Sequence, residues 1–129
     1  MLKDYKKHCK EREEMGIPPL PLDAEQTAAL IELLKKDHKE SDFLLNLLKE
    51  RVPAGVDDAA YVKAGFLSDL TKGKTNSPYI TKEDAVVILG TMLGGYNIQP
   101  LIDCLEIDGL ADDAANALSN TLLIFDAFN

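Results

Sequence analysis

The apolar side chains of this chain recur every three or four residues along almost its whole length, and this period constrains the fold more than any other feature. Leu30, Ile31 and Leu34 keep that spacing in one stretch, and Phe66 and Leu70 keep it in another. Spacings of three and four place side chains on one face of an α-helix. The pattern predicts seven helical segments and no strand.

Capping residues stand in front of most of these segments. Asp23 precedes the second helix with Gln26 three residues later, and Thr81 precedes the fifth helix with Asp84 three residues later. Each pair has the spacing of a capping box, in which two side chains bond backbone amides at the helix start. Three more N-caps are expected on the same grounds, namely Ser41, Asp57 and Asn97.

Glycines and prolines mark the predicted helix ends. Gly16 closes the first helix, and the prolines that follow force an extended connection, because each fixes φ and restricts the residue before it. Pro53 ends the third helix, Gly73 takes the C′ position of the fourth, and the Gly94-Gly95 pair ends the fifth. The short connections imply that consecutive helices are antiparallel neighbours.

The predicted helix pairs open at Asp23, Asp57 and Asn97, which are 34 and 40 residues apart. These offsets straddle the ~34 residues of TPR repeats and the ~40–47 residues of HEAT repeats, and the Trp-containing TPR signature is missing. We therefore predict an all-α fold in which antiparallel helix pairs stack as a HEAT-like α-α superhelix.

One domain is expected over residues 1–129, with an N-terminal helix over 1–16 and stacked helix pairs over 23–126. Because Trp is absent and aromatic residues are few, the core must be aliphatic. The fifth helix is expected at its centre, with an inner face of Ala85, Ile88, Leu89 and Met92, and with Val86 and Val87 leaving little polar surface. Inward-facing residues are also expected on the last two helices, namely Leu101, Ile102, Leu105, Ala114, Ala115, Leu118, Leu122 and Phe125.

The formal net charge of −8 argues against broad contact with nucleic acid or anionic membrane, because phosphate binding draws its affinity from Lys and Arg. A basic cluster over residues 3–12 is the local exception. It fits a solvated amphipathic helix, and it also fits a docking patch for an acidic partner or RNA. We expect no transmembrane span and no secretory signal, and two distant cysteines indicate reduced thiols, so a cytoplasmic protein is expected.

Residues that could carry chemistry are few and scattered. Zinc and iron–sulfur sites need three or four thiolate or imidazole ligands at close spacing. This chain has two cysteines and two histidines, of which only His8 and Cys9 are neighbours. The serines lack a nucleophile-elbow motif, and the paired carboxylates at 57–58 and 112–113 are explained by their place at helix starts. We predict no catalytic, cofactor-binding or metal-binding residue.

The stretch from Leu93 to Pro100 concentrates unusual residues in one turn. Two glycines, a tyrosine, an Asn N-cap and a Pro in the first turn of the next helix define a sharp corner between helices. A tight corner and a docking surface both fit this composition. The candidate interaction surface combines the corner with a tyrosine of the fourth helix, and its residues are Gly94, Gly95, Tyr96, Asn97, Gln99, Pro100 and Tyr61.

Three long runs of the sequence carry a family resemblance. They are LGTMLGGYNIQPLID at residues 89–103, RVPAGVDDAAYVKAGFL at 51–67 and LSNTLLIFD at 118–126, and they are joined by PLDA at 21–24 and FLL at 43–45. In this order, the runs resemble the N-terminal HEAT-like domain of aconitase B, the bacterial aconitate hydratase 2 or 2-methylisocitrate dehydratase. The resemblance covers nearly the whole chain.

The resemblance implies a parent enzyme, a lyase that interconverts citrate and isocitrate in the citric acid cycle. That family uses a [4Fe–4S] cluster held by three cysteines in later domains. Its HEAT-like domain is associated with protein contacts, with dimerisation and with access to the active site, and the cluster-free form is associated with mRNA binding. No catalytic residue of the family maps onto this chain, and its two cysteines cannot supply three cluster ligands.

We therefore expect a non-catalytic protein-interaction domain. Its partner would be the remaining aconitase domains or a second copy of the chain. A free-standing HEAT-like adaptor that acts on an aconitase or on another protein is the alternative, and it includes a contribution to aconitase activity in trans. An RNA-binding module that uses the basic cluster is a further alternative, which the net charge disfavours.

Overall fold

The computed structural model describes residues 2–53, 57–92 and 95–127, with side chains up to residue 119. Over these ranges the chain forms seven helices and no strand, so the all-α prediction is confirmed. The helices are α1 (Leu2–Glu14), α2 (Ala24–Leu34), α3 (Ser41–Glu50), α4 (Asp58–Thr71), α5 (Lys82–Gly90), α6 (Ile98–Cys104) and α7 (Ala111–Ala127).

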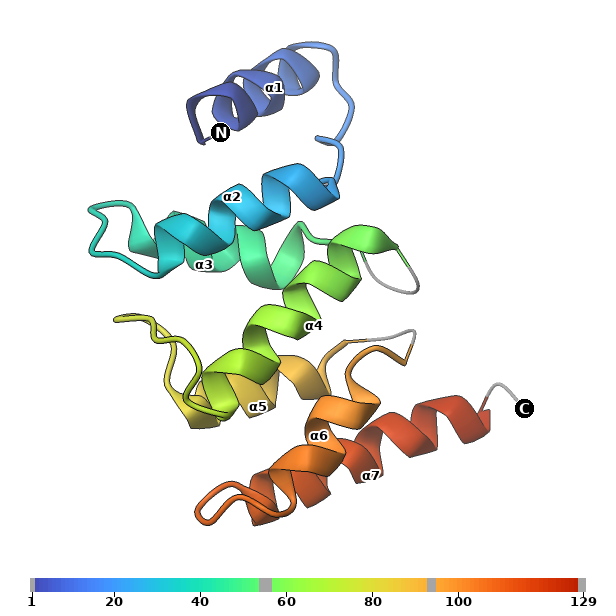
Figure 1. Ribbon diagram of the computed structural model, residues 1–129. Helices are drawn as coiled ribbons and strands as arrows, with labels where there is room; N and C mark the ends of the chain where they lie inside the picture. Colours follow the sequence, from blue (N-terminus) through green and yellow to red (C-terminus); the bar gives the residue numbers. More distant parts are fainter. Residues whose placement is uncertain (1, 54–56, 93–94, 128–129) are drawn as a thin grey trace.

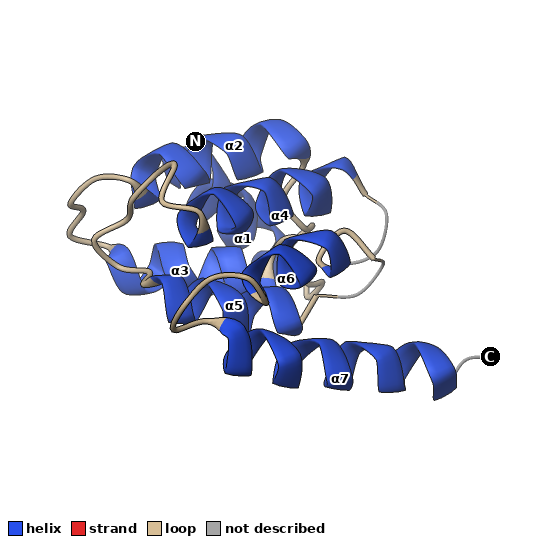
Figure 2. Cartoon of the chain, turned by 60° about the horizontal axis from the view of Figure 1, so that its bottom comes forward, coloured by secondary structure: helices blue, strands red, loops and turns tan. Residues whose placement is uncertain are grey.

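The helices stack in pairs from α1 at one end of the molecule to α7 at the other (Figure 1). Helices α2 and α3, α4 and α5, and α6 and α7 pack against each other as the predicted pairs. Successive pairs are joined through α2 with α4, α4 with α6, and α5 with α7. Figure 2 shows the result as two layers, with α2, α4 and α6 in one and α3, α5 and α7 in the other.

Local capping explains where most of these helices begin. Asp23 accepts a hydrogen bond from the Gln26 amide at 2.7 Å, and the Gln26 side chain accepts one from the Asp23 amide at 3.0 Å. Thr81 and Asp84 form the second capping box with distances of 3.0 and 3.2 Å. The Asp57 carboxylate caps α4 by accepting a bond from the Ala59 amide at 3.0 Å. The three caps confirm the predicted starts of α2, α4 and α5.

The end of α4 also follows the prediction. Gly73 has a φ of +75°, which places it in the left-handed region that favours glycine. The Gly73 amide donates to the Leu70 carbonyl at 3.3 Å, and the Lys74 amide donates to the Asp69 carbonyl at 2.9 Å. These two bonds form a Schellman motif, which satisfies carbonyl groups that the helix leaves open at its C-terminus.

Helix α3 begins at Ser41 itself, so the prediction of Ser41 as its N-cap is wrong. Glu40 is the N-cap, because its carbonyl already accepts the first helical bond from the Leu44 amide at 3.0 Å. The Glu40 amide donates instead to Nδ1 of His38 at 3.0 Å. His38 thus satisfies the amide of the N-cap residue, while no side chain of the N-cap bonds the first-turn amides of α3.

Helix α5 ends at Gly90, ahead of the Gly94-Gly95 pair that was predicted to end it. Gly94 lies outside the described residues, while Gly95 has a φ of +98° in the turn before α6. A Cβ atom on Gly90 would lie 2.8 Å from the Cβ of Ala117, so α5 and α7 cross in close contact at this position. The crossing brings the final turn of α5 against the next pair.

The core is aliphatic as predicted and runs through all the pairs. On α5 the predicted inner face and Val86 are buried, but Val87 is 60% exposed. On α6, Leu101 and Cys104 are buried while Ile102 and Leu105 are exposed, because a two-turn helix buries only one narrow face. Ala115 is exposed too, whereas Ala114 and Leu118 are buried. The side chains of Leu122 and Phe125 lie outside the described residues.

Helix α1 is attached mainly through the proline-rich segment that follows it. Tyr5 is buried and donates to the Leu20 carbonyl at 3.0 Å, and the Leu20 amide donates to Nε2 of His8 at 2.9 Å. Arg12 donates to the Pro18 carbonyl at 2.9 Å. Burial raises the pKa of Tyr5, and the neighbouring Cys9 raises it further. No helix within the described residues is long and apolar enough to cross a membrane.

Candidate interaction surface

Asn97 occupies the N-cap position of α6, but its side chain turns back towards α5. Its Nδ2 donates to the Leu89 carbonyl at 2.7 Å and to the Met92 carbonyl at 3.2 Å. The residue is fully buried, and its Oδ1 has no hydrogen-bond partner among the described residues. Asn97 therefore closes the C-terminal end of α5 instead of capping α6, which corrects the role that its position suggested.

Packing of α4 beside α6 brings two distant tyrosines together. Tyr61 on α4 and Tyr96 in the corner meet edge to face, with ring centroids 5.3 Å apart and planes at 73°. Aromatic pairs favour this arrangement because the positive edge of one ring meets the negative face of the other. Tyr61 is 65% exposed, so the pair lies at the molecular surface.

A groove of about 340 Å³ lies between α4 and α6 beside this pair. Five of the seven predicted residues line it, since Gly94 lies outside the described residues and Asn97 is buried beneath the corner. Helix α4 supplies three further lining residues that the sequence did not predict. The full lining is Tyr61, Ala64, Gly65, Ser68, Gly95, Tyr96, Gln99 and Pro100.

A second groove of about 340 Å³ lies on the other side of α4, against α2. It shares Tyr61 and Gly65 with the first groove, so the two form one surface that passes over Gly65. A Cβ atom on Gly65 would meet nothing within 4 Å. We name the union of the two grooves the α4 saddle. Gly65 itself is not among the predicted residues, because a glycine inside a helical stretch is no specific sign of a groove.

Ion pairs lie in and beside the saddle. Lys72 lies 3.0 Å from Asp103, and Gln99 donates to the same carboxylate at 2.9 Å. Both hydrogen bonds lower the pKa of Asp103, and the bond from Lys72 has the larger effect. On the other side, Lys35 pairs with Glu32 at 3.0 Å. Among the described residues that line the saddle, the one ammonium group, that of Lys35, is therefore paired with a carboxylate.

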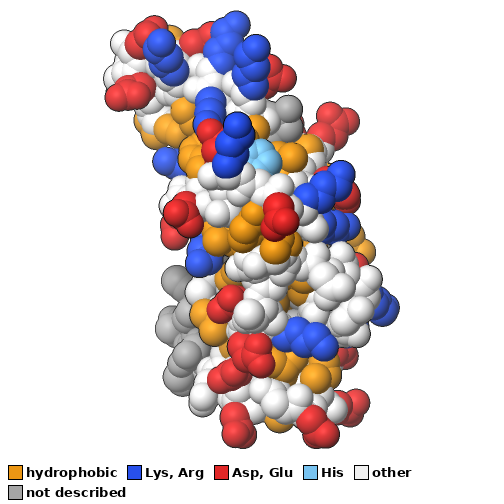
Figure 3. Space-filling view, turned by 90° about the vertical axis from the view of Figure 1, so that its left-hand side faces the viewer, with side chains coloured by type: hydrophobic (Ala, Val, Ile, Leu, Met, Phe, Trp, Pro, Cys, Tyr) orange, Lys and Arg blue, Asp and Glu red, His pale blue; other side chains and the backbone are white. Residues whose placement is uncertain are grey.

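Charge is distributed unevenly along the stack. Figure 3 shows Lys and Arg side chains gathered over α1 at one end, and Asp and Glu side chains along the edge formed by the last helices. No Lys or Arg follows Lys82, so the whole formal charge of −8 belongs to residues 83–129. The predicted basic cluster is partly engaged within the chain, because His8 and Arg12 bind the proline-rich segment and Lys6 pairs with Glu40.

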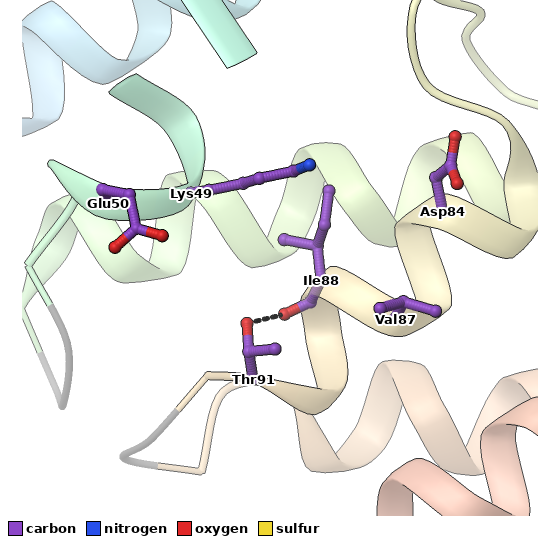
Figure 4. Close-up of a pocket in the computed structure, with 6 residues that line it drawn as sticks. All are labelled: Lys49, Glu50, Asp84, Val87, Ile88 and Thr91. Atoms are coloured by element: carbon purple, nitrogen blue, oxygen red, sulfur yellow. Dashed lines mark hydrogen bonds between the residues drawn. The ribbon is translucent and has the colours of Figure 1, made fainter. Parts of the chain in front are cut away.

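Another groove, of about 380 Å³, lies between α3 and α5 (Figure 4). Lys49 and Glu50 come from α3, and the α5 side offers Asp84, Val87, Ile88 and Thr91. The polar groups of α5 already serve its own structure, because Asp84 belongs to the capping box and the Thr91 hydroxyl donates to the Ile88 carbonyl at 2.7 Å. The groove offers no convergent set of groups for chemistry.

Metal ligands are not grouped in the described part of the chain. No three His, Cys, Asp or Glu side chains there come close enough to hold a metal ion. Cys9 lies on α1, and Cys104 is fully buried on α6 near the opposite end of the stack. Two thiols so placed do not fit the three-cysteine ligand set of an iron–sulfur cluster.

Comparison with known proteins places these observations in a family. The model of the family described as the aconitate B N-terminal domain matches residues 4–129. The chain belongs to this family. It is 60% identical to aconitate hydratase B of Escherichia coli strain K12 over 129 residues, 54% identical to that of Synechocystis over 132, and 48% identical to that of Helicobacter pylori strain J99 over 130.

Each match covers 99% or 100% of the chain but only 15% of the relative. The chain thus spans less than a sixth of the length of the aconitate hydratases that it resembles. The resemblance inferred from the three sequence runs is confirmed at the level of the family. The aconitate B N-terminal domain family is represented here by stacked helix pairs, with a groove and a tyrosine pair at the α4–α6 corner.

Proposed function

We propose that this chain is a non-catalytic protein-contact domain of an enzyme of the aconitate hydratase B type. The family match over residues 4–129, with the relatives extending far beyond the matched region, is the observation that carries the proposal. The described residues offer stacked helices with grooves and an exposed tyrosine, which suits contact with another protein surface. They offer no grouped set of metal ligands.

The remaining domains of such an enzyme are the proposed partner. Catalysis, with any iron–sulfur cluster that it requires, is assigned to those domains, because the two cysteines here lie on separate helices and one is fully buried. A cytoplasmic location is part of the same proposal, since the relatives are bacterial aconitate hydratases. A second copy of this chain is the alternative partner.

Light scattering tests the proposal. The purified chain is mixed with an aconitate hydratase B that lacks the corresponding region, and the mass in solution is followed over a range of concentrations. A mixed complex is the expected result. A chain that stays separate from the enzyme at all concentrations would count against it, and a chain that associates only with itself would favour the alternative partner.

Enzyme activity in the same mixtures tests the contribution in trans. If the domain shapes access to the active site, its addition changes the rate of the shortened enzyme, while the chain alone shows no activity. A complex without any change in rate would leave the contact function in place and remove the link to catalysis.

A further inference from the structure

Gly65 occupies the centre of α4 without a reason in the packing of this chain. Glycine inside a helix is disfavoured relative to alanine, because it loses more backbone freedom on folding. A Cβ atom at this position would meet nothing within 4 Å. A larger residue would therefore fit the fold, and the missing side chain keeps the saddle open between the two grooves.

The exposed line of α4 is acidic at both ends and uncharged in the middle. Helical geometry at 100° per residue places Asp58, Gly65 and Asp69 within about 20–40° of one another around the helix axis. Asp58 and Asp69 are exposed and form no ion pair with other described residues. They lie eleven positions apart, which corresponds to about 16 Å along α4.

The flanks of the saddle supply the apolar contacts. Tyr61 and Tyr96 stand together on the α6 side, and Val62 and Phe66 line the α2 side. Tyrosine is enriched among the residues that dominate binding energy at interfaces. The lining of the two grooves holds two carboxylates, Glu32 and Asp69, and a single ammonium, Lys35, which already pairs with Glu32 at 3.0 Å.

We propose that the α4 saddle seats an amphipathic helix that lays aliphatic side chains over Gly65 and directs Lys or Arg at its two ends towards Asp58 and Asp69. This inference rests on the proposed contact function and names the chemistry of the segment that the domain receives. Helix-in-groove recognition uses an apolar face on the ligand and an open groove on the receptor. The absent side chain at Gly65 lets the backbones of the two helices come close.

Charge complementarity selects this occupant over an acidic one. An acidic helix would place carboxylates beside Asp58 and Asp69, and the lining of the saddle has no unpaired ammonium to offset that repulsion. A nucleic acid would meet the same repulsion at every phosphate. A basic helix gains two favourable contacts that weaken as salt screens them.

Synthetic peptides test the proposal with the full chain. The probe is a fluorescently labelled helical peptide with leucines along one face and lysines about eleven residues apart at its ends. Two matched probes replace the terminal lysines with glutamates or the leucines with serines. Fluorescence anisotropy gives the affinities, and amide chemical shifts locate the contact on the chain.

The expected result is binding of the lysine–leucine peptide alone, with shift changes over α4 and the corner. Gly65→Met fills the saddle and weakens that binding at least tenfold, while Val87→Met on the exposed side of α5 leaves it unchanged. The double variant Asp58→Asn/Asp69→Asn weakens it and removes most of its salt dependence. Circular dichroism melting confirms that each variant is folded.

Three results would overturn the proposal: no binding of the lysine–leucine peptide, equal binding of the glutamate-ended peptide, or full affinity in Gly65→Met. The contact function is judged separately, by complex formation with the shortened enzyme. If Gly65→Met forms that complex as well as the unaltered chain does, the contact function stands and the assignment of the saddle falls.

Discussion

Gly65 and Gly90 are both glycines within helices, but they face different surroundings. At Gly90 a Cβ atom would lie 2.8 Å from the Cβ of Ala117, so the residue is required for α5 and α7 to pack. At Gly65 the same atom would meet nothing within 4 Å. The α5–α7 contact is thus shaped by the packing of the fold, whereas the α4 saddle is left open at a position where the fold would accept a side chain.

The largest effect on stability is expected from placing a side chain in the close α5–α7 contact at Gly90. Gly90→Leu should lower the free energy of unfolding by about 3 kcal/mol, because a side chain forced into a packed contact displaces backbone or leaves its rotamer minimum. Urea unfolding followed by circular dichroism measures the change. Gly65→Leu is the matched control, and it should not destabilise the chain. Equal destabilisation by both substitutions would show that Gly65 and Gly90 do not differ in the room around them.

A size exchange tests whether the close contact itself causes that loss. Gly90→Ala and Ala117→Gly are each measured alone and then combined in a double-mutant cycle. Since the double variant restores room for one methyl group at the crossing, the two substitutions should be coupled by about 1 kcal/mol. Purely additive effects would assign the cost of Gly90→Ala to something other than Ala117.

The second largest effect on stability is expected at Asn97, which links the start of α6 to the end of α5. Asn97→Ala removes the donors to the carbonyls of Leu89 and Met92 and leaves these groups without their partner, so stability should fall by about 2 kcal/mol. Gln99→Ala, two residues on and exposed, should change stability by less than about 0.5 kcal/mol. Thermal melting compares the pair. A similar loss for both would place Gln99 in the framework of the corner with Asn97.

Most helix boundaries could be predicted because capping is local. Asp23 with Gln26 and Thr81 with Asp84 satisfy backbone groups within four residues, so their chemistry is visible in the sequence. Asn97 has the right residue type and position for a cap, but tertiary contact turns its side chain towards the preceding helix. Sequence alone does not distinguish those two directions, since an Asn side chain serves both.

The site was predictable only in its chemical character. The sequence predicts Tyr61 and the corner residues as candidates, but their meeting depends on how α4 packs beside α6. Gly65 carries no local signal of an open groove, because its significance depends on the empty space around it. The prediction that Ile102 and Leu105 face inward is wrong for a related reason: the hydrophobic period marks a broad stripe, while neighbouring helices cover only part of it.

Lys63 lies about 200° around α4 from Gly65 and therefore on the buried face of the helix. Lys63 is 5% exposed, and burial lowers its pKa from 10.5 to about 8, an effect that the nearby Glu50 charge partly opposes. Lys63→Met should raise stability at pH 7 by roughly 1–3 kcal/mol, because an apolar side chain of similar length removes the cost of a buried charge. Urea unfolding at pH 7 measures the gain.

The pH profile checks the cause of that gain. Below about pH 8 the lysine is charged in both states and carries its full cost, and above pH 10.5 it is neutral in both. Between these values the unfolded chain binds more protons, so the stability of the unaltered chain relative to Lys63→Met should rise with pH. A constant difference across this window would show that packing, not charge, explains the effect. Lys49→Met, an exposed neighbour on α3, is the control.

The smallest effect on stability is expected at Gly65, where an added methyl group should stabilise the chain, in contrast to the loss expected from filling Gly90. Gly65→Ala should raise the free energy of unfolding by roughly 0.5–1 kcal/mol, because alanine restricts the unfolded chain and favours helix. The added methyl group meets no atom within 4 Å that it would have to displace. Gly90→Ala provides the contrast, since the same helix preference is there opposed by the contact with Ala117. Chemical unfolding of both variants under one set of conditions decides the point. A loss of stability in Gly65→Ala would mean that the saddle is already filled by this chain's own packing, and the distinction between the two glycines would then rest on Gly90 alone.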